Sequence, residues 1–78
     1  MKEWDDLDRV VLELWTADAV VLFDWLMSVD FETIPVTHRG QKQALMDLLT
    51  ALEVTEVAAS RGDDIGAAQE RVARDMDW

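Results

Sequence analysis

The stretch from residue 10 to residue 29 constrains this chain more than any other part of its 78 residues. Fifteen of its 20 residues are apolar, but Glu13, Asp18 and Asp24 are spread through it. Carboxylates are costly at mid-bilayer depth, so we do not expect this stretch to span a membrane. We expect it instead to form the buried part of a small soluble protein.

The length of the chain leaves room for one domain, residues 1–78, with a small core. Half of the residues are apolar, which is too large a share for a disordered chain. The sequence has no cysteine, so neither a disulfide nor a thiolate metal site can strengthen the core. We therefore expect helix packing to hold the fold, and a homodimer to add apolar burial.

The residues after Thr16 have the apolar spacing of a helix over about residues 17–29. Thr16 is expected to be the N-cap of this helix, and Asp18 lies in the first turn, where an acid suits the helix dipole. The apolar arc is wider than one face, which predicts a central helix or one that also faces a partner. It includes Leu22, Trp25, Leu26 and Val29.

Two further helices are predicted after the connector that contains Pro35. The first covers about residues 41–53, with Thr37 as a cap, and its leucines 45, 48, 49 and 52 form one stripe. The second begins at Asp63 as N-cap and carries an outer ion pair between Glu70 and Arg74. Its apolar stripe consists of Ile65, Ala68, Val72 and Met76. The expected fold is an all-α bundle of three or four helices.

Residues 7–15 admit two interpretations. Leu7, Val10, Val11, Leu14 and Trp15 have helical spacing, and we favour a helix here. The same stretch is rich in strand-forming residues, so a short strand is the alternative. Such a strand would pair either with residues 54–57 or with a second copy of itself.

The charge of the chain is strongly negative, with 17 acidic and 7 basic residues and a net charge of −10. Direct binding to nucleic acid or to an anionic membrane requires clustered lysine and arginine, so neither is expected. The charge keeps a small apolar protein soluble, and it also favours encounter with a basic protein partner. The N-terminus has no basic segment leading into an apolar stretch, so a cytoplasmic location is expected.

The inventory of chemically active residues is short. His38 is the single histidine, and the common motifs for nucleophilic, zinc and phosphate-binding sites are absent. We therefore expect no enzyme, and no catalytic, cofactor or metal site. Asp5, Asp6 and Asp8 lack the spacing of a calcium loop and are interpreted as first-turn acids.

Four tryptophans, Trp4, Trp15, Trp25 and Trp78, are many for so short a chain. One interpretation places Trp15 and Trp25 in the core, with Trp4 and Trp78 covering its ends. The other exposes one or two of them in an acid-rimmed apolar patch, as in a binding hot spot. The candidate partner-binding residues are Trp4, Asp5, Asp6, Asp8, Trp15, Asp18, Asp24 and Trp25.

The sequence LELWTADAVVLFDWL, followed by QKQALMDLLTALE, resembles a group of small acidic uncharacterised bacterial proteins over about residues 7–75. This resemblance implies no activity. With a strand before the helices, the chain is also similar to ribbon-helix-helix repressors, in which that strand pairs across a dimer and presents basic residues to DNA. Here Arg9 is followed by Val10, Val11, Leu12, Glu13 and Leu14, which argues against DNA binding.

These observations predict a non-catalytic interaction module that binds a basic surface of another protein, as small inhibitors, antitoxins and immunity proteins do. A nucleic-acid mimic that blocks a DNA- or RNA-binding protein is the first alternative. It requires carboxylates in regular rows, whereas an inhibitor requires an apolar centre with an acidic rim. A self-associating structural protein, or a dimer of ribbon-helix-helix type, is the second alternative.

Overall fold

The computed structural model describes residues 9–75, and these form three α-helices and one 3-10 helix. Their order is α1 (Thr16–Ser28), α2 (Arg39–Glu53), η1 (Glu56–Ala59) and α3 (Gly62–Asp75). Residues 9–75 include no β-strand. The predicted all-α fold is confirmed, with three helices.

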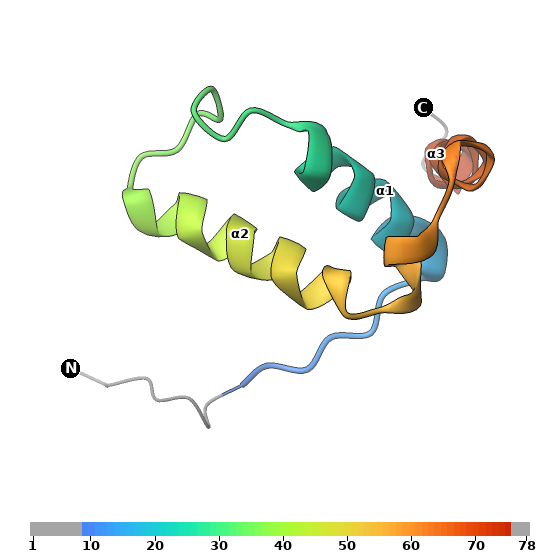
Figure 1. Cartoon of the computed structure of the whole chain (residues 1–78), viewed down its shortest axis with the longest axis horizontal. Helices are drawn as coiled ribbons and strands as arrows, with labels where there is room; N and C mark the ends of the chain where they lie inside the picture. Colours follow the sequence, from blue (N-terminus) through green and yellow to red (C-terminus); the bar gives the residue numbers. More distant parts are fainter. Residues whose placement is uncertain (1–8, 76–78) are drawn as a thin grey trace.

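α1 is the central element of the bundle. It packs against α2, α3 and η1, whereas α2 and α3 make no contact with each other within the described residues. Figure 1 shows α2 lying beside α1, with α3 crossing the first part of α1. The wide apolar arc of α1 follows from this position, because neighbours cover it from several sides.

The core is small and centres on Leu26, whose side chain is only 1% exposed. Around it lie partly buried apolar residues, including the α2 leucines Leu45, Leu48 and Leu49. Because few side chains are completely enclosed, each contributes a large share of the apolar burial. The buried residues are Ala19, Val20, Leu26, Leu52, Val57 and Ala68.

α1 begins one residue earlier than the sequence predicts, and Thr16 is not its N-cap. Trp15 occupies the N-cap position, and its carbonyl oxygen accepts the backbone N–H of Ala19 at 3.0 Å. Trp15 has no side-chain acceptor for the first-turn amides, and the structure shows no side-chain capping bond. Asp18 lies in the first turn, as predicted.

α2 begins with a reciprocal cap at His38, not at Thr37 as predicted. The Nδ1 atom of His38 accepts the backbone N–H of Gly40 at 2.8 Å. The side-chain oxygen of Gln41 accepts the backbone N–H groups of His38 and Thr37, at 3.2 Å and 2.7 Å. His38 therefore has a structural role at this helix start.

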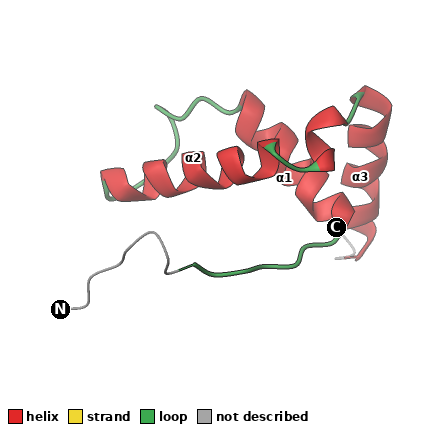
Figure 2. Cartoon of the chain, turned by 60° about the horizontal axis from the view of Figure 1, so that its bottom comes forward, coloured by secondary structure: helices red, strands yellow, loops and turns green. Residues whose placement is uncertain are grey.

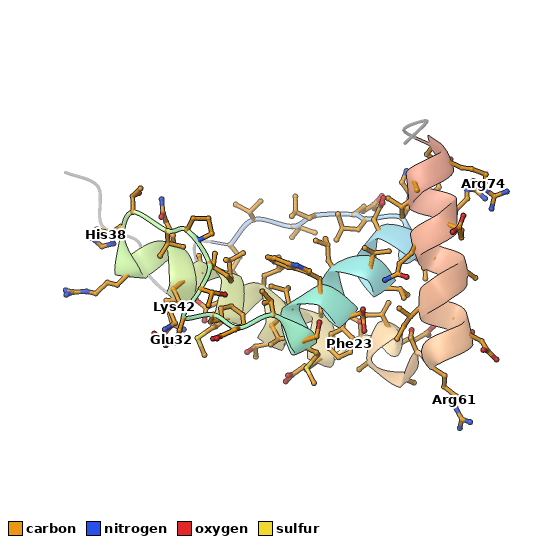
Figure 3. All side chains as sticks on the ribbon, turned by 90° about the horizontal axis from the view of Figure 1, so that it is seen from above. Phe23, Glu32, His38, Lys42, Arg61 and Arg74 are labelled. Atoms are coloured by element: carbon orange, nitrogen blue, oxygen red, sulfur yellow. The ribbon has the colours of Figure 1, made fainter. Side chains whose placement is uncertain are left out.

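The connector between α1 and α2 is fixed at two points. The carboxylate of Asp30 accepts the backbone N–H of Glu32 at 2.9 Å, which closes a local turn. The side chain of Glu32 forms an ion pair with Lys42 of α2, and Figure 3 shows the two side chains pointing toward one another. The connector is thus attached to the helix that follows it.

α3 starts at Gly62, so the predicted N-cap Asp63 lies inside its first turn. The carbonyl oxygen of Arg61 accepts the backbone N–H of Ile65 at 2.9 Å, and the carboxylate of Asp64 accepts that of Arg61 at 3.1 Å. Asp64, the third residue of α3, thus provides a hydrogen-bond acceptor for the backbone N–H of Arg61, the residue before the helix.

The outer ion pair of α3 also differs from the prediction. It joins Arg71 and Asp75, at 3.4 Å between Nε and Oδ1, and not Glu70 and Arg74. Both pairs have helical i, i+4 spacing, but the order with the base first is the less favourable one. Met76, the last member of the predicted stripe, lies outside the described residues.

The segment of residues 9–15 is not a helix, so the favoured prediction for residues 7–15 is wrong over the part that the structure describes. This segment runs away from the start of α1 as an extended chain beneath α2 in Figures 1 and 2. A helix here would need a surface on which to bury its stripe, and Leu12 would interrupt its polar face. Pairing with residues 54–57 is also wrong, because those residues form a turn and the start of η1.

Candidate interaction surface

Residues 9–15, which we call the extended segment, expose most of their apolar side chains. Val10, Val11 and Trp15 are 87%, 90% and 82% exposed, and Leu12 is 70% exposed. An exposed leucine is ordinary by itself, but a continuous run of this kind is typical of an interaction surface. The extended segment is therefore the first feature of the candidate site.

A groove of about 380 Å³ lies between the start of α1 and the end of α3. Its apolar part comes from Trp15, Ala17 and Val72, and two carboxylates, Asp18 and Asp75, lie on its border. We call it the Trp15 groove; it is lined by Trp15, Thr16, Ala17, Asp18, Arg71, Val72 and Asp75.

The Trp15 groove already contains one cation, the guanidinium of Arg71. Its partner is Asp75, and the two side chains are 68% and 62% exposed. Ion pairs of this exposure are worth about 0–1 kcal/mol, because water screens them and ordering the side chains costs entropy. A cation arriving from outside can therefore compete for the carboxylate of Asp75.

A second groove, of about 350 Å³, lies on the side of α1 that faces the end of α2 and η1. Leu12 and Leu14 of the extended segment form one border of it, and Leu52 and Val57 lie on the other side. We call it the Leu12 groove; it is lined by Leu12, Leu14, Thr16, Ala19, Leu52, Thr55, Glu56 and Val57.

The structure brings together two of the candidate partner-binding residues, Trp15 and Asp18, in the Trp15 groove. Asp24 and Trp25 lie further along α1 and line neither groove. The side chain of Trp25 is 45% exposed, so about half of its surface is removed from solvent. The remaining candidates, Trp4, Asp5, Asp6 and Asp8, lie outside the described residues, as does Trp78.

Five residues of the Trp15 groove were not predicted as part of a site, and three of them, Arg71, Val72 and Asp75, belong to α3. The apolar stripe of the last helix identified Val72 as inward-facing. The sequence offered no signal for the contact between the end of α3 and the start of α1, because that contact depends on how the two helices cross.

Residues 9–75 contain neither a metal-ligand cluster nor a membrane-spanning helix. No three acidic or histidine side chains of these residues gather closely enough to hold a metal ion. Among the same residues, no helix is long and apolar enough to cross a membrane. His38 is exposed, and its ring nitrogen serves the start of α2.

Comparison of the chain with protein-family models, with curated proteins and with solved structures gave no match.

Proposed function

We propose that this chain is a non-catalytic protein-interaction module that binds a basic segment of another protein in the Trp15 groove. The observation that carries the proposal is the exposure of Trp15, at 82%, beside the carboxylates of Asp18 and Asp75. An apolar aromatic surface next to acids is the arrangement that a cationic partner requires.

The chemistry of recognition follows from these three side chains. An arginine or lysine of the partner can lie over the indole face of Trp15, where a cation–π contact is worth about 0.5–2 kcal/mol. The same cation can donate hydrogen bonds to Asp18 or Asp75, and such bonds are stronger than those between neutral groups. Arginine fits best, because its planar guanidinium can stack and donate at once.

The net charge of −10 adds a long-range contribution to this local recognition. It attracts a basic partner before contact and raises the association rate, most strongly at low ionic strength. The apolar contacts at Trp15 act after contact and set the lifetime of the complex. This division of roles is that of a small inhibitor, antitoxin or immunity protein.

Nucleic-acid mimicry remains the competing proposal, and the two differ in what the partner would contact. A mimic would act through its carboxylates alone, so loss of Trp15 would matter little. The combination of an exposed indole, Val72 and bordering carboxylates in one groove supports the inhibitor-like module instead.

The test uses a short arginine-rich peptide, titrated into the chain and followed by two-dimensional NMR. The resonances of the Trp15 indole N–H and of residues 16–18 and 71–75 should shift together and saturate. Trp25, which lies outside the groove, is the internal control. Small shifts spread evenly over all acidic residues would contradict the proposal, because they indicate attraction without a site.

A further inference from the structure

The backbone of the extended segment has no partner over most of its length. From Val10 to Leu14, within the part of the chain that the structure describes, no amide or carbonyl group forms a hydrogen bond. An extended segment that exposes both its backbone and its apolar side chains offers a template for another strand. Native proteins usually cover or blunt such an edge.

The side chains of the extended segment divide between two faces, as in a β-strand. Leu12 and Leu14 border the Leu12 groove, whereas Trp15 borders the Trp15 groove. The even-numbered face is therefore turned toward the end of α2 and η1. Strand-like alternation places Val11 and Glu13 on the odd-numbered face, opposite to it.

We propose that the extended segment pairs with the same segment of a second copy of this chain, as an antiparallel two-stranded ribbon. This inference concerns a different surface from the Trp15 groove and goes beyond the proposed function. Residues 9–75 contain no other unpaired extended stretch that could serve as the partner. A second copy brings an identical one, and antiparallel pairing of identical strands is self-complementary.

Charge and side-chain direction select the register of this ribbon. The even-numbered residues of both copies must share one face if they are to cover both Leu12 grooves. A register centred on Glu13 would place two glutamates directly opposite each other, which is unfavourable. A register centred on Leu12 places Leu12 opposite its copy and Glu13 opposite Val11, so we assign this one.

A dimer of this kind buries the paired backbones and the even-numbered side chains that face the Leu12 grooves. Val10 and Leu12 are 87% and 70% exposed in the single chain, so covering them removes apolar surface from water. Val11 and Trp15 lie on the other face and stay accessible. The buried area therefore lies below the roughly 1,200–2,000 Å² of stable interfaces and predicts a weak dimer.

Salt dependence separates this dimer from the proposed basic partner. Two copies, each with a net charge of −10, repel one another, and added salt screens that repulsion. The dimer should therefore become tighter as salt rises, whereas a complex with a basic partner should become weaker. Failure of one proposal is thus distinguishable from failure of the other.

The first test is disulfide cross-linking of single-cysteine variants, which is simple because the chain has no cysteine of its own. Opposed Cα atoms in an antiparallel pair lie about 4.5–5.5 Å apart, within the range that a disulfide spans. Leu12→Cys should cross-link fastest and Glu13→Cys more slowly. Val54→Cys, at a position that is 85% exposed and outside both grooves, is the control.

The second test is sedimentation equilibrium at low and high salt, on the wild-type chain and two matched variants. Leu12→Asp should weaken the dimer about tenfold or more, because it adds a charge inside an apolar contact. Val54→Asp adds the same charge at an exposed apolar position outside the segment, and it should change the dissociation constant by about twofold at most. Circular dichroism should show unchanged helix in both variants.

Two results would overturn the ribbon. One is a wild-type chain that stays monomeric at high micromolar concentration in high salt. The other is cross-linking of Leu12→Cys at a rate no greater than that of Val54→Cys. Faster cross-linking between a Leu12→Cys copy and a Leu14→Cys copy than between two Leu12→Cys copies would overturn the assigned register, because positions 12 and 14 lie opposite each other only when the ribbon is centred on Glu13.

Discussion

Asp18 of α1 and Asp75 of α3 border the same groove, although one lies in the first turn of its helix and the other ends its helix. The crossing of the two helices brings these carboxylates to the exposed indole of Trp15. Under the proposed function, this groove holds a cation of the partner between the indole and the two carboxylates.

The first prediction concerns Asp18. Asp18→Asn should weaken binding of an arginine-rich peptide about two- to fivefold, since an exposed charge pair contributes about 0.2–1 kcal/mol. The matched control is Asp24→Asn, which removes a carboxylate from the same helix but outside the groove. Isothermal titration should show little change for Asp24→Asn, and an equal effect of both substitutions would contradict the site.

The second prediction separates the two described tryptophans. Trp15→Ala should shorten the lifetime of the complex with a cost of about 2 kcal/mol or more, as at a hot spot, and leave thermal stability nearly unchanged. Trp25→Ala should lower the melting temperature, because the side chain of Trp25 is only 45% exposed and its removal loses buried apolar surface. Surface plasmon resonance and thermal unfolding measure the two effects, and stability loss on Trp15→Ala alone would place Trp15 in the core.

The third prediction concerns the core. Leu26→Ala should cost about 3–5 kcal/mol of unfolding free energy, because Leu26 is only 1% exposed and its removal leaves a cavity. Leu48→Ala and Leu49→Ala should each cost about 2 kcal/mol, since these side chains are half-buried. Urea unfolding measures all three, and an effect of Leu26→Ala below that of Leu48→Ala would contradict the packing described above.

The fourth prediction uses two glycines in helices. Gly66→Ala should stabilise the fold by about 0.5–1 kcal/mol, because alanine is the better helix former and its Cβ would meet no atom within 4 Å. Gly40→Ala should give less, because its Cβ would lie 3.1 Å from Nδ1 of His38, which serves as the cap. Equal stabilisation by both in thermal unfolding would show that the His38 cap adapts without cost.

The helices after residue 15 could be predicted from the sequence because their apolar spacing matches how they pack. The stripe of leucines predicts α2 closely: the observed helix begins at Arg39, two residues before the predicted start at residue 41. The helix starts were less predictable. The predicted caps were Thr16, Thr37 and Asp63, which are favourable capping residues. The helix starts are instead set by backbone geometry and by the side chains of Gln41 and Asp64, which accept hydrogen bonds from backbone N–H groups that precede their helices.

The extended segment shows where periodicity is insufficient. Val10, Val11, Leu14 and Trp15 satisfy a helical template, but a helix forms only if its apolar face has something to cover. Val10, Val11 and Trp15 of that face are 87%, 90% and 82% exposed, and β-branched Val10 and Val11 favour an extended backbone. The candidate site was predictable only in part for the same reason, since Trp15 is exposed by the conformation of this segment.

An exposed extended segment should also make the protein sensitive to proteases. Proteases cleave chains that they can bind in extended form, and residues 10–14 already have that form without any unfolding. When a second copy or another protein covers residues 10–14, proteases cannot bind this segment. Unoccupied copies would then be degraded first, and the amount of this protein would follow the amount of whatever covers it.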